Sequence, residues 1–188
     1  MKVALIGGTG AFGKALGKRL VEAGAEVIVG SRDAARAQDA AEELGAAAGM
    51  TNEDAVRAAD LAVLAVKADA ALDTARELAD ALGGTPLLSV AAELNFGPDG
   101  VKPAPEALSL AAANLGGEEQ PEEDALVCGD DERAKELALE LAGTVVRGRA
   151  VDAGPLASAR ALEGLTAVIV NVNRRYKAHA GIRVSGLR

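Results

Sequence analysis

Short apolar runs alternate with amphipathic segments through the first half of the chain. Unbroken apolar runs are typical of strands covered on both faces of a parallel sheet, and apolar positions three and four apart are typical of helices. This pattern predicts strands at 2–6, 26–30, 61–66 and 86–90, and helices at 11–23, 33–44, 52–58 and 69–82. Because strand and helix alternate, we expect an α/β fold built on a doubly wound parallel sheet.

The pattern loosens between residues 95 and 124, where proline, glycine and acidic residues gather. We expect loop there, interrupted by one short apolar segment at 107–115. Regularity returns with a strand at 125–128, a helix at 132–141, a strand and turn at 144–152 and a long helix at 155–177. The sequence therefore predicts a doubly wound domain over 1–124 and a small C-terminal extension of helix and strand over 125–188, packed on it as one compact unit.

A glycine-rich turn, Gly8-x-Gly10-x-x-Gly13, follows the first predicted strand and opens the first predicted helix. Gly8 and Gly10 lack the Cβ that would keep a pyrophosphate off the backbone, and Gly13 lets the helix pack close to the strand. The N–H groups and the positive end of the helix dipole face the same phosphate. The turn predicts a Rossmann dinucleotide site formed by Gly8, Thr9, Gly10, Ala11, Phe12 and Gly13. A purely structural turn is the alternative.

The second predicted strand ends in Gly30-Ser31-Arg32, without the acid that usually binds the ribose 2′-hydroxyl of NAD. A hydroxyl and a guanidinium at this position suit a 2′-phosphate, and Arg36 lies one helical turn beyond Arg32. Asp33 is the complication, and we interpret it as the cap of the next helix. The sequence therefore predicts NADP(H) rather than NAD as the cofactor, with a solvated helix face as the alternative for the arginines.

Net charge is −8 at pH 7, which argues against nucleic acid or an anionic membrane as a main partner. No apolar stretch reaches the roughly 20 residues needed to span a bilayer. Cys128 is the only cysteine, and Met1 leads directly into a predicted strand without a signal peptide, so we expect a cytoplasmic location and no metal site. We interpret Cys128 as a buried strand residue, and His179, the only histidine, as an implausible general base.

Four motifs, at Met1–Gly13, Val29–Arg32, Val127–Asp131 and Val151–Leu156, resemble the NADPH-dependent reductases of the deazaflavin coenzyme F420, and residues 171–183 resemble bacterial members of that family. The resemblance covers most of the chain. It implies that hydride passes directly between NADP(H) and coenzyme F420, a reaction that needs no acid–base side chain. It also implies that Thr9, Ser31, Arg32 and Arg36 hold the NADP phosphates, and that Arg160 and Thr166 lie near the second ligand.

The chain departs from that family in two places. Family members carry an additional strand and helix before the Val127–Asp131 motif, where this chain has only the short segment 107–124, which contains no histidine. Lys67 stands where the family tends to have proline. The resemblance therefore supports the NADP site more fully than the deazaflavin site.

Residues near the second ligand also have structural interpretations. Arg160 sits among small residues, and a salt bridge to Glu163 or Asp152 is the alternative to a ligand contact. The basic C-terminal segment either complements the helix dipole or attracts the anionic tail of a deazaflavin.

We expect an oxidoreductase that passes hydride between NADP(H) and coenzyme F420, and the long helix at 155–177 makes a homodimer plausible. Two alternatives remain open. One is an NADPH-dependent reductase of another small carbonyl or imine, which would need a proton donor. The other is an NADP-binding module that has lost catalysis with the shortened segment and acts as a sensor or partner subunit.

Overall fold

The computed structural model describes residues 1–92, 94–103 and 121–187. These residues fall into two compact units, Met1–Ala91 and Ala92–Arg188. The division lies earlier than the boundary after residue 124 that the sequence predicts, because a hairpin at 94–103 packs on the long helix of the second unit. The apolar segment predicted at 107–115 lies outside the described residues.

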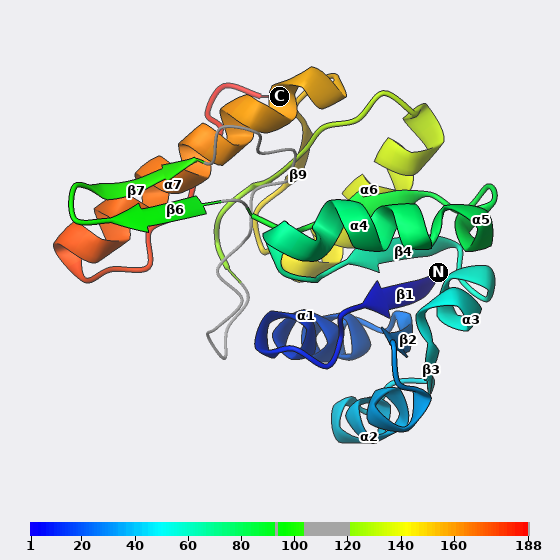
Figure 1. The fold of residues 1–188 in the computed structure, drawn as a ribbon. Coiled ribbons are helices and arrows are strands. Elements are labelled where there is room, and N and C mark those ends of the chain that lie inside the picture. Colours follow the sequence, from blue (N-terminus) through cyan, green and yellow to red (C-terminus); the bar gives the residue numbers. More distant parts are fainter. Residues whose placement is uncertain (93, 104–120, 188) are drawn as a thin grey trace. The chain divides into compact units, whose positions relative to one another are not determined.

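Within residues 1–91, all described, the first unit is a five-stranded parallel sheet with helices between its strands (Figure 1). The strands are β1 (Lys2–Ile6), β2 (Glu26–Ser31), β3 (Ala48–Thr51), β4 (Leu61–Leu64) and β5 (Leu87–Ser89), in the spatial order β3-β2-β1-β4-β5. β1 lies at the centre, where Leu5 pairs with Val29 of β2 on one side and Val63 of β4 on the other. This order is the doubly wound Rossmann arrangement, so the predicted fold class is confirmed.

The centre of the sheet is the core of the first unit. Val3 to Ile6 of β1 and Leu61 to Val63 of β4 are completely buried. Each of the Val, Leu and Ile side chains among them stabilises the fold by about 1.5–3 kcal/mol relative to an exposed one. The unbroken apolar runs in the sequence therefore correspond to strands covered on both faces.

β3 is a strand that the apolar pattern did not predict. Its sequence, Ala-Gly-Met-Thr, carries few large apolar residues. The packing of helix α2 (Ala34–Leu44) explains the glycine, because a Cβ on Gly49 would lie 2.2 Å from the carbonyl oxygen of Ala37. The strand is fixed by this close backbone approach and by its pairing with β2.

The helices of the first unit are α1 (Ala11–Glu22), α2, α3 (Asn52–Arg57), α4 (Ala68–Glu77) and α5 (Ala79–Leu82). Asp33 caps α2 as predicted, with its Oδ1 accepting hydrogen bonds from the backbone N–H groups of Ala35 at 2.9 Å and Arg36 at 3.3 Å. The single helix predicted at 69–82 is instead two helices that meet at Leu78.

The second unit contains two small sheets and two main helices in its described part. β6 (Leu94–Gly97) and β7 (Gly100–Pro103) form an antiparallel hairpin where the sequence predicts loop, and β8 (Ala125–Val127) and β9 (Ala150–Asp152) pair in parallel. Helix α6 (Glu132–Val145) runs four residues beyond the predicted helix, so the predicted strand at 144 begins later. A short 3-10 helix η1 (Leu156–Ser158) precedes the long helix α7 (Ala159–Tyr176).

Two asparagines on α7 act as clamps on extended backbone. Asn171 accepts a hydrogen bond from the N–H of Val101 and donates one to its carbonyl oxygen, both at 2.8 Å, and so holds β7. Asn173 forms the same pair of bonds with Ala180: it accepts from the N–H at 2.6 Å and donates to the carbonyl oxygen at 3.1 Å. Each side-chain amide forms the two backbone hydrogen bonds that a neighbouring strand would form. These bonds hold the β6–β7 hairpin and the C-terminal segment against α7.

Asp124 joins the C-terminal segment to β9. Its Oδ1 accepts a hydrogen bond from the backbone N–H of Arg149, and its Oδ2 accepts from Arg149 Nη2 and from the N–H of Val184, all at 2.8 Å. The side chain is almost completely buried. These bonds, that from the Arg149 side chain foremost, hold the pKa of the Asp124 carboxyl well below its ordinary value of 3.8.

Asp124→Asn should loosen the C-terminal segment, because an amide nitrogen in place of either oxygen would face an N–H donor. Hydrogen–deuterium exchange over 178–187 at pH 7 should therefore be faster in the variant. In the wild type, the pKa of Asp124 is lower in the folded state than in the unfolded state. The carboxylate therefore stabilises the fold fully above about pH 4, and this stabilisation decreases as the pH falls toward the folded pKa. Asp99→Asn, in the exposed turn between β6 and β7, is the control. Equal protection in the two variants would contradict the assignment.

Candidate functional site

A cleft of about 640 Å³ opens at the carboxyl ends of the central strands of the first unit. In parallel sheets this edge is where ligands bind, beside the point at which the strand order reverses. One side of the cleft comes from the turns after β1, β2 and β3, and the other from the turn after β4 and from α4. The first side carries Gly7, Thr9, Ser31, Arg32, Asp33, Arg36 and Asn52; the second carries Val66, Lys67, Asp69, Ala70, Asp73, Thr74 and Glu77.

The turn between β1 and α1 is fixed by close backbone contacts. The N–H of Gly10 donates to the carbonyl oxygen of Gly7 at 3.1 Å, and a Cβ on Gly13 would lie 2.4 Å from that same oxygen. Gly13 is therefore a packing requirement, as predicted. Gly7 was missed by the sequence analysis, although it has a positive φ of 84° and leaves no space for a Cβ beside Val66.

Gly10 has a different environment from its neighbours. A Cβ built there would meet only the carbonyl oxygen of Gly7, at 3.5 Å, so the protein itself leaves space at this position. Gly10 is also the N-cap of α1, and it has no side chain with which to cap the helix. The first N–H groups of a helix carry partial positive charge and bind anions. The turn thus fits a phosphate, with the absent Cβ at Gly10 as the observation that supports it.

The end of β2 offers a hydroxyl and two guanidinium groups to the cleft. Arg32 and Arg36 are exposed, and neither forms an ion pair within the described part of the chain. Ser31 Oγ accepts a hydrogen bond from the N–H of Asp33 at 3.3 Å. The Asp33 carboxylate caps α2 and forms no ion pair with either arginine. The arginines remain available to an anion.

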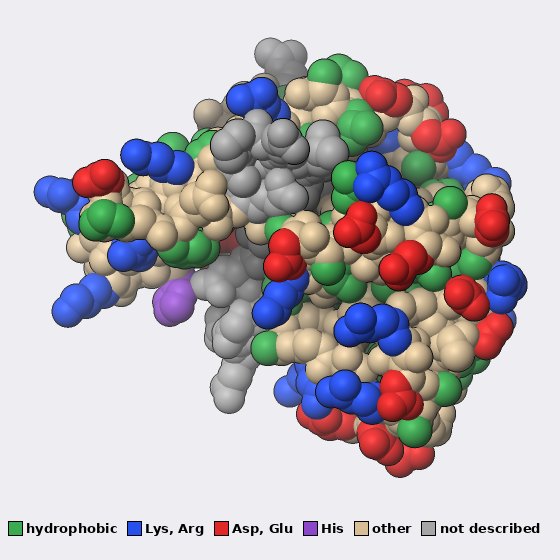
Figure 2. All heavy atoms as spheres, in the orientation of Figure 1, with side chains coloured by type: hydrophobic (Ala, Val, Ile, Leu, Met, Phe, Trp, Pro, Cys, Tyr) green, Lys and Arg blue, Asp and Glu red, His purple; other side chains and the backbone are tan. Residues whose placement is uncertain are grey.

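The wall formed by α4 is mainly acidic. Asp69, Asp73 and Glu77 line it, and Asp73 pairs with Arg76 on the same helix at 3.3 Å. Lys67, at the N-cap of α4, is exposed and lines the cleft. On the face drawn in Figure 2, acidic and basic side chains are intermingled over the first unit rather than gathered in separate patches.

The two residues expected near a second ligand lie on α7 but do not share a cavity. Thr166 is buried, donates a hydrogen bond to the carbonyl oxygen of Leu162 at 3.0 Å and lines a cavity of about 530 Å³ within the second unit. That cavity also contains the side chains of Ile169, Asn173 and His179. Arg160 is exposed and does not line this cavity.

Neither salt bridge that the sequence suggested for Arg160 forms among the described residues. Asp152 pairs instead with Lys135 at 3.1 Å, and Glu163 is completely buried. The small residues around Arg160 in the sequence do not bury it, because it lies on the exposed side of α7.

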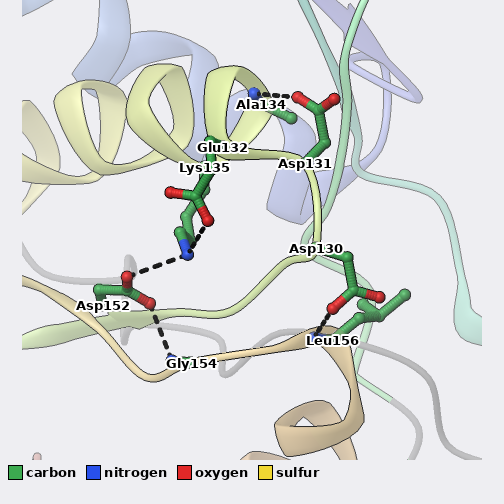
Figure 3. Close-up of polar contacts among 8 residues, drawn as sticks. All are labelled: Asp130, Asp131, Glu132, Ala134, Lys135, Asp152, Gly154 and Leu156. Atoms are coloured by element: carbon green, nitrogen blue, oxygen red, sulfur yellow. Dashed lines mark hydrogen bonds and ion pairs between the residues drawn. The ribbon is translucent and has the colours of Figure 1, made fainter.

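Two motifs that the sequence analysis singled out, Val127–Asp131 and Val151–Leu156, lie side by side (Figure 3). Asp130 accepts a hydrogen bond from the N–H of Leu156 at 2.9 Å, and Asp131 caps α6 by accepting from the N–H of Ala134 at 2.7 Å. Their carboxylates thus bind backbone. Asp130 therefore fixes the start of the segment that leads into α7, and Asp131 fixes the start of α6.

Lys135 completes this network from α6. Its Nζ lies 3.0 Å from Glu132 Oε1 and 3.1 Å from Asp152 Oδ2, and these two hydrogen bonds raise the pKa of the lysine. The N–H of Gly154 binds Asp152 Oδ1 at 2.8 Å, and this bond, followed by that from Lys135, lowers the pKa of the aspartate. Both groups therefore stay charged at neutral pH and link α6 to β9.

Cys128 is buried against Ala159 and Leu162, as the sequence predicts, but it lies one residue beyond the end of β8 rather than in the strand. Burial, reinforced by the charges of Asp130 and Asp152, raises the pKa of its thiol. A protonated thiol is a poor nucleophile. Among the described residues, no group of three or more His, Cys, Asp and Glu side chains is placed to hold a metal ion, and no helix has the length and apolar character required to cross a membrane.

The family model and the curated relatives that match this chain agree with one another. Residues 2–93 match the family model described as NADP oxidoreductase, coenzyme F420-dependent. The F420-dependent NADP reductase of Methanothermobacter thermautotrophicus (strain Delta H) is 32% identical in an alignment that covers 100% of this chain and 96% of the relative. That of Methanocaldococcus jannaschii is 30% identical, covering 100% of this chain and 99% of the relative.

Both alignments run over 222 positions, more than the 188 residues of this chain, so these relatives carry residues within the aligned region that this chain lacks. The crystal structure of a proposed F420-dependent NADP reductase from Arthrobacter sp. FB24 is similar in fold, with a TM-score of 0.78, 20% identity, and coverage of 99% of this chain and 100% of that one. The identity to the two archaeal reductases extends over the whole chain, and the chain therefore belongs to the family of F420-dependent NADP reductases.

Proposed function

We propose that this chain transfers hydride between NADP(H) and coenzyme F420. The observation that carries the proposal is the identity of 30% and 32% to proteins named for this activity, over the full length of the chain. The arginines at the end of β2, which no carboxylate among the described residues pairs, supply independent support for the NADP half.

The cleft of the first unit is the proposed NADP(H) site. The backbone of the turn Gly8, Thr9, Gly10, Ala11, Phe12 and Gly13 would hold the pyrophosphate, while Ser31, Arg32 and Arg36 would hold the 2′-phosphate. Of these residues, Thr9, Ser31, Arg32 and Arg36 line the cleft, whereas the glycines shape it. The donor set of N–H, hydroxyl and guanidinium groups matches a polyanionic ligand.

Catalysis in this proposal depends on position rather than on acid–base chemistry. The bound nicotinamide supplies the hydride chemistry, and the protein aligns the two ligands and excludes water. Arg160 and Thr166 are the candidate contacts to coenzyme F420. Arg160 is exposed and without an ion pair among the described residues, which leaves its guanidinium available to the anionic ligand.

A homodimer formed through α7 is part of the proposal. Large apolar side chains are exposed along this helix, with Leu165 at 36%, Val168 at 56% and Tyr176 at 69% exposure. Such a stripe is typical of an interface between subunits. We also place the protein in the cytoplasm, which agrees with a chain that holds its single cysteine as a buried free thiol.

Arg32→Ala should weaken NADPH binding about tenfold or more and leave NADH binding nearly unchanged, because a charge-assisted contact to the 2′-phosphate is lost. Isothermal titration calorimetry with each nucleotide measures both affinities. Arg57→Ala, which removes an exposed arginine from α3 outside the cleft, serves as the control. Equal losses for NADPH and NADH would remove this argument for nucleotide choice.

Gly10→Val should abolish nucleotide binding while the far-UV circular dichroism spectrum stays native. The space at this position tolerates a side chain in the protein alone but not beside a pyrophosphate. Gly84→Val is a control, since a Cβ there meets nothing within 4 Å and the residue lies outside the cleft. Normal NADPH binding by the Gly10 variant would mean that the turn has only a structural role.

Purified protein mixed with NADPH and coenzyme F420 should reduce the deazaflavin measurably but slowly. A shortened segment should cost ring alignment more than nucleotide affinity, and a misplacement of about 1 Å can cost about a hundredfold in rate. Arg160→Ala should lower turnover further without changing NADPH affinity, whereas Arg133→Ala on α6 should change neither. Tight NADPH binding with no deazaflavin binding at any accessible concentration would instead favour a catalytically silent NADP-binding module.

A further inference from the structure

Asn52 is a cleft residue that no motif indicated. It is the first residue of α3, immediately after β3, and it lines the same cleft as Ser31 and Arg32. The register explains this position: Thr51 of β3 pairs with Ser31 of β2, so the residue that follows each strand leaves the sheet at the same edge. Asn52 therefore stands beside the proposed 2′-phosphate site but one strand further out.

The amide oxygen of Asn52 is buried and has no hydrogen-bond partner among the described residues. It lies over the backbone of Gly30, where a Cβ would approach it to 3.0 Å. The same Cβ would lie 2.7 Å from Ile6 Cδ1, so the absence of a side chain at Gly30 makes space for Ile6 and for the amide. Buried polar atoms in native proteins are nearly always paired, and an acceptor left without a donor inside a ligand cleft indicates that the ligand supplies the donor.

The chemistry of the cleft restricts which donor this is. Ser31, Arg32 and Arg36 are suited to the phosphate on the ribose 2′-oxygen. The amide oxygen repels that phosphate, so Oδ1 requires a hydrogen-bond donor instead. The 3′-hydroxyl is the donor on the adjoining ribose carbon, and the adjoining cleft residue, one strand out from Ser31, is Asn52.

We propose that Asn52 is a nucleotide-positioning residue whose Oδ1 accepts a hydrogen bond from the 3′-hydroxyl of the adenosine ribose. The inference rests on the proposed function, since it concerns the same NADP(H) site. In this arrangement Ser31, Arg32 and Arg36 at the end of β2 bind the 2′-phosphate, and Asn52 after β3 binds the 3′-hydroxyl. The two contacts together fix the rotation of the ribose about its own axis.

The 3′-hydroxyl is common to NADPH and NADH, and this separates Asn52 from Arg32 experimentally. Asn52→Ala should weaken both nucleotides by the same factor, about tenfold, as measured by calorimetry. Asn52→Asp keeps an acceptor at this position, so NADH binding should be retained, while NADPH should bind more weakly because the carboxylate repels the 2′-phosphate. Asn95→Ala, an exposed asparagine on β6, is the control, and far-UV circular dichroism checks the fold of each variant.

A ligand lacking the hydroxyl tests the contact itself. The probes are adenosine 2′,5′-bisphosphate and its 3′-deoxy analogue, each titrated into wild type and into Asn52→Ala. Wild type should lose about tenfold in affinity for the deoxy analogue, and the variant should bind the two probes equally, so that the two losses do not add.

Two results would overturn the inference while leaving the proposed function intact. In the first, the wild type binds NADPH and the Asn52→Ala variant binds NADPH with the same affinity. In the second, the variant still discriminates against the 3′-deoxy probe as strongly as wild type does. A wild-type protein that binds neither NADPH nor the bisphosphate would overturn the proposed function, and this inference with it.

Discussion

The backbone contact between Gly7 and Gly13 is the constraint on which the first unit depends. A Cβ on Gly13 would lie 2.4 Å from the carbonyl oxygen of Gly7, so the first turn of α1 is pressed directly against the end of β1. This contact sets the direction of the helix and aims its N–H groups at the cleft. Because β1 is the central strand, the same contact places the turn next to the ends of β2 and β4.

In the described part of the second unit, polar side chains that bind backbone hold short strands and irregular segments in place. Asn171 and Asn173 hold two extended segments against α7, Asp124 holds the C-terminal segment, and Asp130 holds the residues before α7. Each of these groups satisfies N–H or carbonyl groups that irregular backbone would otherwise leave unpaired. A unit with short strands can therefore keep a defined arrangement around one long helix.

The sequence predicted those features that depend on local pattern. The apolar runs of β1, β2 and β4 and the cap at Asp33 were correct because burial on both faces and capping each leave a mark at fixed spacing. β3 was missed because its strand character comes from Gly49 fitting against Ala37, a contact with another element. The β6–β7 hairpin was missed for the same reason, since Asn171, some seventy residues away, supplies its partner.

The same distinction between local pattern and contacts with other elements applies to the residues of the candidate site. Thr9, Ser31, Arg32 and Arg36 could be named from the sequence because they follow strands within a known motif, and all four line the cleft. Asn52 and Gly7 could not, because the first depends on strand register and the second on the position of Val66. Arg160 showed the limit of composition as evidence, since small neighbours in sequence did not bury it.

The buried thiol of Cys128 has a practical consequence for chemistry on this protein. Thiol reagents and oxidants attack the thiolate, and both the burial and the raised pKa of Cys128 keep that form scarce at neutral pH. A cysteine engineered at an exposed position would therefore react selectively in the presence of the natural one. Fluorescent or spin labels can thus be attached at a single chosen place, such as either rim of the cleft, without first removing Cys128 from its packing against α7.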